Sequence, residues 1–409
     1  MQEYQFTKIR QQFAREALAD IEETVHQQVT AKLKIAPGAN IAITVGSRGV
    51  ANIARIAKAT AEAVKACGGA PFIIPAMGSH GGATAEGQRE ILASYGVTED
   101  AMGCPIRSSM EVAEIDSTGL EMRIFMDKFG YESDGVILLN RIKPHTAFHA
   151  DYESGLVKMS VIGLGKQRLA DEIHTFGVHG LTTIMPAAAR RIFSTGKVVL
   201  GVGIVENAYD DTAIIEALTP DEILTREPEL LRTAKQLMPS FPLRDIDVLI
   251  VDKLGKNISG SGMDPNVIGR MKVPGTPEPE YPKTKVIVVT DITDASHGNA
   301  CGIGLADVTT RRLLNKVDWD ATYTNAVTSG FYEHSMLPVV AATDKQAFEW
   351  GIRASHDPYK PKNIIRIKDT LHVSEMYVSE PALNEVRDRV EIISEPMNLF
   401  DSEGSLIAF

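Results

Sequence analysis

A glycine-rich segment with a histidine at its centre is the first candidate for chemistry in this chain. It spans residues 76–84 and contains Gly78, Ser79, His80 and Gly81. The segment follows a predicted strand and precedes a predicted helix, which is where open α/β sheets bind ligands. Glycines at a helix N-terminus let backbone N–H groups approach an anion. We therefore expect these residues to bind a ligand, the alternative being a turn whose histidine only caps the helix.

Two histidines four residues apart follow another predicted strand, in the segment Lys143-Pro144-His145-Thr146-Ala147-Phe148-His149. In a helix the two rings would share a face and could chelate a metal. Pro144 favours a loop instead. Imidazole has an unperturbed pKa of about 6.5, so His145 is suited to exchanging a substrate hydroxyl proton near neutral pH. For His149 we favour a structural role.

Two lysines and a further histidine come next. Lys158 ends the segment Asp151-Tyr152-Glu153-Ser154-Gly155-Leu156-Val157-Lys158, and Lys166 ends Gly163-Leu164-Gly165-Lys166. A lysine amine can bind phosphate, or attack an electrophilic carbon if its pKa is lowered. His174 follows the acidic pair Asp171-Glu172, so it could ligate a metal with a carboxylate near its other ring nitrogen.

Turn-forming residues gather at two places in the C-terminal half. The segment 256–266 leads to Arg270-Met271-Lys272, and the segment 294–304 has the same character. Neither contains a complete Gly-x-Gly-x-x-Gly directly after a strand with an acidic residue about 20 positions on. This argues against dinucleotide binding.

The elements that must position these residues are those of an α/β protein with mostly parallel sheets. β-branched runs without polar alternation predict strands buried on both faces. Amphipathic stretches at 50–67 and 85–94 predict helices. The predicted strands are Asn40–Val45, Pro71–Pro75, Gly135–Leu139, Val198–Val205, Asp247–Val251, Lys285–Thr290 and Asn363–Ile367. A Pro- and Glu-rich loop, Pro274–Lys283, should be exposed.

Length and composition set the frame for these elements. A chain of 409 residues predicts more than one domain. The two prolines of 237–243 suggest a boundary between a cofactor-binding and catalytic domain, 1–242, and a C-terminal α/β domain, 243–409, with the active site in a cleft between them.

The net charge and the cysteine count limit which partners and which compartment can be expected. A net charge of −11 argues against nucleic acid. Three cysteines without a close pair suggest neither disulfides nor a cysteine-based zinc site, and fit the cytoplasm. The sequence contains no uninterrupted apolar stretch of about 18 residues, which argues against a membrane-spanning helix. Any anionic small-molecule partner would then be bound by a few local cations.

Taken in order, these residues resemble the nickel-dependent lactate racemase family, and the resemblance covers most of the chain. The matching elements are Gly-Ser-Arg-Gly at 46–49, Gly-Ser-His-Gly at 78–81, Lys-Pro-His at 143–145, Tyr-Glu-Ser-Gly-Leu-Val-Lys at 152–158, His174 and the segment ending at Lys272. Val45, Leu156-Val157 and extra residues between His145 and Lys158 depart from the family pattern and indicate a divergent branch.

The resemblance implies a fold, a cofactor and a set of roles. The cofactor is the nickel-pincer nucleotide, pyridinium-3,5-bisthiocarboxylic acid mononucleotide nickel, bound covalently through Lys158 with His174 as a nickel ligand. His80 and His145 would be the acid/base pair on opposite sides of the substrate. Arg48 and Lys272 would bind its carboxylate or nearby anionic groups.

This implied chemistry inverts the α-carbon of a 2-hydroxy acid by hydride transfer. Direct removal of the α-proton is difficult, because the neighbouring carboxylate leaves it very weakly acidic. In the hydride route one histidine takes the hydroxyl proton while the pyridinium ring accepts hydride, which gives a bound 2-keto acid. Return of hydride to the opposite face, with the other histidine, gives the other configuration. The expected substrate is lactate-like or larger, such as a sugar acid.

Two other functions compete with the racemase or epimerase. One is a metal-dependent hydrolase using His145, His149 and His174, although no His-Glu-x-x-His signature is present. The other is a non-catalytic protein that binds a small anion or a metal. The sequence leaves the oligomeric state open.

Overall fold

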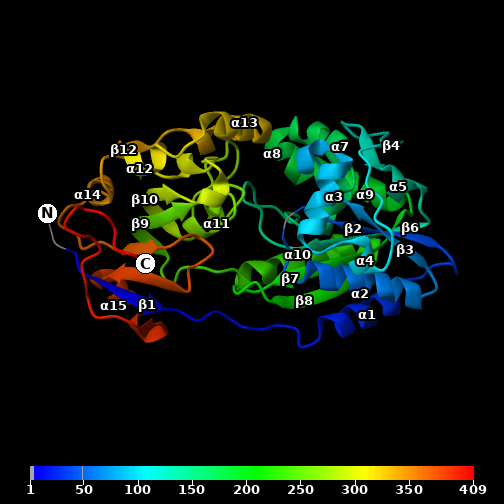
Figure 1. Ribbon diagram of the computed structural model, residues 1–409, viewed down its shortest axis with the longest axis horizontal. Coiled ribbons are helices and arrows are strands. Elements are labelled where there is room, and N and C mark those ends of the chain that lie inside the picture. The colour runs from blue at the N-terminus through cyan, green and yellow to red at the C-terminus, as the bar shows by residue number, and fades with distance from the viewer. Residues whose placement is uncertain (1–3, 48) are drawn as a thin grey trace. The chain divides into compact units, whose positions relative to one another are not determined.

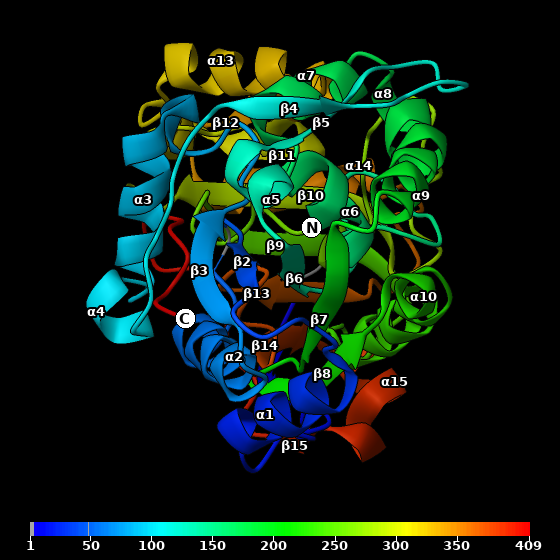
Figure 2. The same ribbon diagram turned by 90° about the vertical axis from the view of Figure 1, so that its right-hand side faces the viewer.

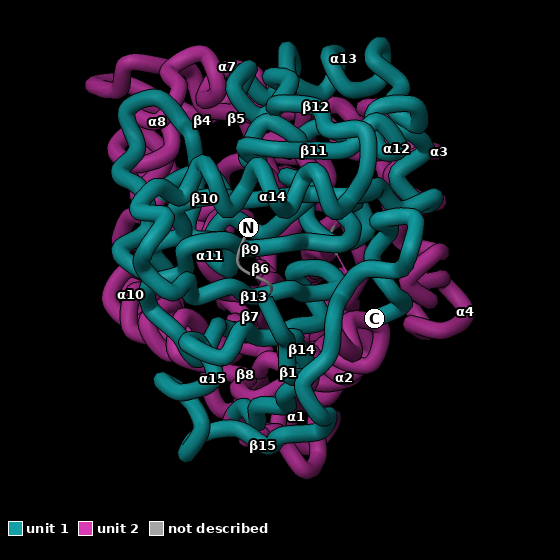
Figure 3. The backbone as a smooth tube through the Cα atoms, turned by 90° about the vertical axis from the view of Figure 1, so that its left-hand side faces the viewer, with its two compact units in different colours: residues 1–13, 146–148, 239–409 teal, residues 14–145, 149–238 magenta. Residues whose placement is uncertain are grey.

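The computed structural model describes residues 4–47 and 49–409, so Arg48, one of the residues expected to bind substrate, lies outside the described residues (Figure 1). The chain forms two compact units (Figure 3). Unit 1 comprises residues 1–13, 146–148 and 239–409, and unit 2 comprises residues 14–145 and 149–238. Each is an α/β structure with a mostly parallel sheet, as the sequence predicts. A division into independently folding domains at residue 242 stays a prediction.

Unit 2 is built on a five-stranded sheet in which only the last pair is antiparallel. In sheet order the strands are β3 (Ala70–Pro75), β2 (Asn40–Val45), β6 (Gly135–Arg141), β7 (Val198–Glu206) and β8 (Thr212–Leu218). The first four confirm the strands expected in this region. Their side chains are buried on both faces, which explains the lack of polar alternation in the sequence.

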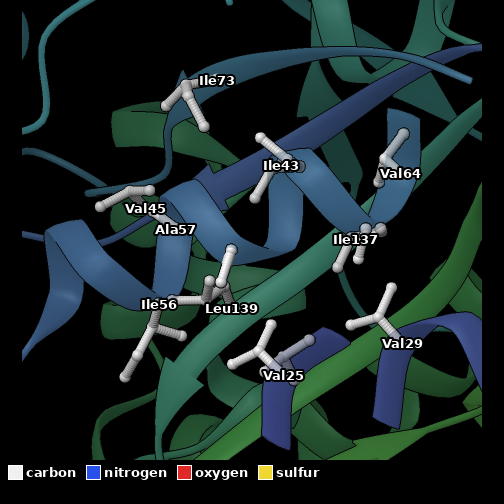
Figure 4. Packing of buried hydrophobic residues seen from close by; sticks show 14 of the residues in the cluster. Val25, Val29, Ile43, Val45, Ile56, Ala57, Val64, Ile73, Ile137 and Leu139 are labelled. Atoms are coloured by element: carbon white, nitrogen blue, oxygen red, sulfur yellow. The ribbon is translucent and has the colours of Figure 1, made fainter. Parts of the chain in front are cut away.

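Two helices cover one face of this sheet. They are α1 (Ile21–Lys32) and α2 (Ile53–Ala66), which lie side by side (Figure 2). Val25 from α1 and Ile56 from α2 pack with Ile43 and Leu139 of the strands in one buried cluster (Figure 4). This apolar layer leaves the other face of the sheet for the segments that carry the candidate chemistry.

On the opposite face lie the short helix α6 (Leu156–Lys158) and the long helix α10 (Pro220–Leu237). A β-carbon at Gly201 of β7 would lie 2.8 Å from a methyl carbon of Leu156. A larger residue there would force the end of the Leu156 side chain to shift, so Gly201 lets α6 lie close to the sheet. A π-helical turn, Met159–Gly163, continues directly from α6. The backbone that carries Lys158 is thus packed on the sheet.

The remaining elements of unit 2 are mainly helical, apart from the hairpin β4 (Val112–Ile115) and β5 (Ile124–Asp127). A second π-helical turn spans Gly180–Ile184, and a 3₁₀ turn spans Gly81–Ala83. The helices are α3 (Ala85–Ser94), α4 (Glu99–Met102), α5 (Lys128–Glu132), α7 (Lys166–His174), α8 (Gly177–His179) and α9 (Met185–Ser194).

Unit 1 is built on an eight-stranded sheet, parallel over its first five strands and antiparallel over the rest. In sheet order these are β12 (Val339–Ala341), β11 (Val308–Thr310), β10 (Lys283–Ile292), β9 (Asp245–Leu254), β13 (Ile364–Ile367), β14 (Glu375–Ser379), β1 (Phe6–Arg10) and β15 (Glu391–Ile392). The expected strands at 247–251, 285–290 and 363–367 are confirmed as β9, β10 and β13. The N-terminal strand β1 pairs with β14 from the far end of the chain.

Helices and turns complete unit 1. α14 packs on the sheet so closely that a β-carbon at its Gly351 would lie 2.8 Å from a methyl carbon of Val288. Most residues of the loop Pro274–Lys283 are exposed, as expected, although Lys283 is already the first residue of β10. The helices are α11 (Pro265–Ile268), α12 (Arg311–Leu314), α13 (Trp319–Ser329), α14 (Asp344–Ala354) and α15 (Glu380–Val386), with 3₁₀ turns at Asp294–Ser296, Ile303–Leu305, Tyr332–Ser335 and Arg387–Arg389.

Two sequence expectations are settled by the side chains and helices. Cys67, Cys104 and Cys301 are all free thiols, so the expected absence of disulfides holds for them. Among the described residues, none of the helices combines the length and the apolar character needed to cross a bilayer.

Candidate active site

The turn that carries His80 begins directly after β3 and ends at α3. Gly78 and Gly81 have φ angles of +58° and +67°. A β-carbon at Gly81 would lie 2.6 Å from the backbone nitrogen of Gln88, so the turn needs glycine to pack on the first turn of α3. His80 is exposed at the tip of the turn, beside the exposed Ser79.

The helix after this turn is capped by another residue. The Thr84 hydroxyl accepts the Gly87 N–H at 3.1 Å, and the His80 side chain makes no capping hydrogen bond. The alternative in which His80 only caps the helix is therefore wrong, because Thr84 already satisfies that N–H group.

His145 lies in a loop, as Pro144 predicts, and one buried carboxylate organises that loop. Glu153 accepts the His145 N–H at 2.6 Å and lies 3.3 Å from Nδ1 of His149. The Lys235 amine from α10 reaches the same carboxylate at 2.6 Å. Burial acts to raise the pKa of Glu153, but hydrogen bonds from His149, Lys235 and the His145 N–H outweigh it and lower the pKa. His149 thus has the structural contact expected of it.

Lys158 and His174 act on each other electrostatically. Lys158 is half-buried in α6, and His174 is the last residue of α7. Solvent reaches the His174 side chain, yet partial burial lowers the pKa of its imidazole. The Lys158 ammonium lowers this pKa further, and Asp171 opposes both effects. At neutral pH the ring is therefore neutral, which is the form that ligates metals.

Of the acidic pair before His174, Asp171 influences the ring, and it does so only through charge. Within 4–47 and 49–409, the ring of His174 makes no hydrogen bond or ion pair, so the carboxylate contact considered from the sequence is not formed. A lone pair of the neutral ring is available to a ligand that is not part of these residues.

Of the two other lysines considered, Lys166 differs sharply from Lys158 in burial, and Lys143 does not. Lys166 is fully buried and forms an ion pair with Asp127, 3.0 Å from amine to carboxylate. Lys143 is half-buried, and its backbone bridges to Ser154. Burial and pairing leave Lys166 unsuited to act as a nucleophile toward a large ligand.

Lys272, the candidate cation of the C-terminal half, lies in unit 1 in a left-handed conformation with φ of +46°. Glu278 accepts its backbone N–H at 3.0 Å, and its amine donates to the carbonyl of Gly304 at 2.8 Å. Burial lowers the pKa of the amine, and Arg270 adds to this effect. These contacts hold both the backbone and the amine of Lys272 in place within unit 1.

Unit 2 therefore carries His80, His145, Lys158 and His174, and unit 1 carries Lys272. Among the described residues there is no group of three or more His, Cys, Asp and Glu side chains arranged to hold a metal ion. Such a group is what the hydrolase alternative requires from His145, His149 and His174.

Comparison with known proteins bears on the fold of this chain. No protein-family model matches the sequence, and neither does any curated protein. Among solved structures, the lactate racemase apoprotein from Thermoanaerobacterium thermosaccharolyticum matches with a TM-score of 0.52 at 14% identity. The match covers 90% of this chain and 99% of that chain. The chain has a lactate racemase-like fold. At this identity the likeness concerns the fold, and the expectation of that fold from the sequence is confirmed.

Four residues that contact the candidate site residues or the segments that carry them were not candidates from the sequence: Gln88, Asp127, Glu153 and Glu227. Glu153 stood within a quoted motif, but nothing marked its carboxylate as buried. Glu227 lies in a helix crowded with charged residues. No sequence pattern separates it from a solvated side chain.

Proposed function

We propose that this chain is a racemase or epimerase that inverts the α-carbon of a 2-hydroxy acid. One observation carries the proposal: in a lactate racemase-like fold, Lys158 lies near enough to His174 for its ammonium to lower the pKa of that imidazole. A lysine amine and a neutral imidazole, both reached by solvent, are the groups needed to hold the nickel-pincer nucleotide.

The residues present fit this cofactor. Lys158 would carry the covalent link, and His174 would ligate nickel through a ring that makes no hydrogen bond within the described residues. The pincer itself would supply the remaining ligands of the metal. Gly78, Ser79 and Gly81 would face the anionic part of the nucleotide. When bound, the cofactor supplies an acceptor for hydride.

The chain's own residues would handle the proton and the carboxylate. His80 and His145 would hold and return the substrate hydroxyl proton, one from each side. Their backbones are fixed differently, His80 by a glycine turn and His145 by Glu153. Arg48 and Lys272 would bind the carboxylate. We propose a cytoplasmic enzyme that acts on a lactate-like or larger hydroxy acid.

The test is the intact mass of the protein produced with and without the enzymes that make the cofactor. We expect an added mass, located by peptide mapping on Lys158, that is lost in Lys158→Ala and kept in Lys128→Ala, a lysine of α5 that pairs with Glu111. Bound zinc without covalent mass would instead support a hydrolase. A protein that gains neither mass nor zinc would be a binding protein for small anions.

A further inference from the structure

Lys166 is a fully buried lysine at the first residue of α7, the helix that ends at His174. Its backbone is left-handed, with φ of +56°, so α7 starts abruptly after the π-helical turn. The amine donates to the carbonyl oxygen of Pro75, the last residue of β3. It also pairs with Asp127 at 3.0 Å, so one ammonium joins β3, the end of β5 and the start of α7.

Gln88 extends this contact to the turn that carries His80. The side chain is fully buried, and its carbonyl oxygen lies 3.4 Å from the Lys166 amine. Its amide nitrogen donates to the carbonyl of Gly78 at 3.0 Å and to that of His80 at 3.2 Å. Gln88 therefore connects Lys166 to the backbone of the turn on both sides of Ser79.

Asp127, the ion-pair partner of Lys166, is itself held in place by the backbone. It ends β5 and accepts the Gly130 N–H of α5 at 2.9 Å, so its carboxylate is held by backbone as well as by Lys166. A buried ion pair is a weak source of net stability, since apolar side chains of the same volume do as well or better. What such a pair offers that apolar side chains cannot is a set of directed hydrogen bonds at fixed positions.

We propose that Lys166, Asp127 and Gln88 form a positioning network that sets the His80 turn relative to α7 and thereby relative to His174. The roles of the two histidines rest on the proposed function. The nine residues of α7 span about 12 Å, so an anchor at Lys166 is transmitted to His174 along a helix. Reactions that need aligned groups lose rate steeply when such groups shift by about 1 Å.

The first test uses the protein without cofactor, so it is independent of activity. Backbone hydrogen exchange is followed by mass spectrometry in peptides covering 76–84 and 166–174. Gln88→Met keeps the volume and removes both bonds to the turn. We expect exchange in 76–84 to rise on the order of tenfold, with 166–174 unchanged. The matched control is Glu90→Ala, an exposed residue of α3.

A double variant, Lys166→Met with Asp127→Asn, removes the charges together and keeps an oxygen to cap α5. We expect faster exchange in both peptides, because Lys166 anchors both segments. If this variant fails to fold, the hydrogen exchange measured for Gln88→Met still tests the proposal. Wild-type exchange in 76–84 for Gln88→Met would overturn the proposal, and so would a uniform rise across unit 2, which indicates only a core residue.

The second test uses the loaded enzyme. We expect Gln88→Met to lower kcat about 10–100-fold, as outer-shell partners of metal and catalytic groups do, while KM and the added mass on Lys158 stay near wild type. An unchanged kcat would overturn the positioning role. If the wild type itself interconverts no hydroxy acid, the proposed function fails, and the exchange experiment alone decides whether the network positions the turn.

Discussion

Glu227 of α10 accepts the backbone N–H of Val157 at 3.0 Å, one residue before Lys158. The carboxyl is completely buried, and burial raises its pKa to about 7. A β-carbon at Gly155 would lie 2.2 Å from its other oxygen, Oε1, so a larger residue just before α6 would force the Glu227 carboxyl to move. That oxygen has no hydrogen-bond partner among the described residues. A titratable group thus closes the N-terminus of the helix that carries the proposed cofactor lysine.

The first prediction concerns the pH dependence of stability. The pKa of Glu227 is about 7 in the folded protein, against a usual value of 4.5, so the folded state keeps a proton that the unfolded state has released. Stability should therefore fall as pH rises from about 4.5 to about 7, by about 3 kcal/mol in total. Glu227→Gln mimics the protonated carboxyl, so the unfolding free energy of this variant should fall less than that of wild type as pH rises. Urea unfolding at pH 5 and pH 8 measures it.

The matched control for this prediction is Glu229→Gln on the same helix, whose side chain is half exposed and pairs with Arg226 at the surface. It should leave the pH dependence of the wild type in place. An identical fall with pH in wild type and Glu227→Gln would show that Glu227 does not titrate in this range.

A second prediction concerns the loop of His145. Removing the Glu153 carboxylate by Glu153→Ala should free the His145 N–H and leave Lys235 without its partner. We expect a loss of stability of about 2–4 kcal/mol, since a buried charged acceptor with several donors is removed. Hydrogen exchange of a peptide covering 143–154 should accelerate selectively. Exchange equal to wild type in that peptide would contradict the role given to Glu153.

The opposite sign of the pKa shift gives this site its own pH signature. Hydrogen bonds hold the pKa of Glu153 below its usual value, so its contribution is present above about pH 4.5 and is lost as pH falls through the lowered pKa. Protection of the 143–154 loop against hydrogen exchange should therefore persist as pH falls through the usual carboxylate range and be lost only at lower pH.

The third prediction concerns the two proposed acid/base histidines. Every turnover in either direction would use one as base and the other as acid. His80→Ala and His145→Ala should therefore each lower both directions together, by about 10²–10⁴-fold. Chiral chromatography from each enantiomer measures the two rates, and the equilibrium constant cannot change. His149→Ala is the control, because its ring contacts Glu153 and has no assigned step. Loss of one direction only would refute the pairing.

The fourth prediction separates hydride transfer from proton abstraction. A hydrogen that moves as hydride does not exchange with water, so deuterium at the α-carbon of the substrate should stay in the product. The reaction is run in light water with deuterated substrate, and in heavy water with unlabelled substrate. Rapid solvent hydrogen incorporation at the α-carbon would mean direct proton abstraction, and the nickel-pincer proposal would have to be abandoned.

Most of the local structure could be predicted from the sequence. The buried strands at 40–45 and 135–139 were predictable because both faces are apolar, and α3 was predictable from its amphipathic pattern. The loop around His145 followed from Pro144, and the turn around His80 followed from its glycines. These features depend on residues close together in the chain, so the sequence records them directly.

Which polar residues are buried, and what they contact, could not be predicted from the sequence and depends on the packing of the whole chain. Lys166 and Glu227 have the residue types of a solvated surface, yet both are enclosed by segments far away in the sequence. Pairing of β1 with β14 is likewise a contact between distant parts of the chain. Burial changes the free energy of a charge more than any local pattern does, and it is set by whichever distant segments pack around that charge.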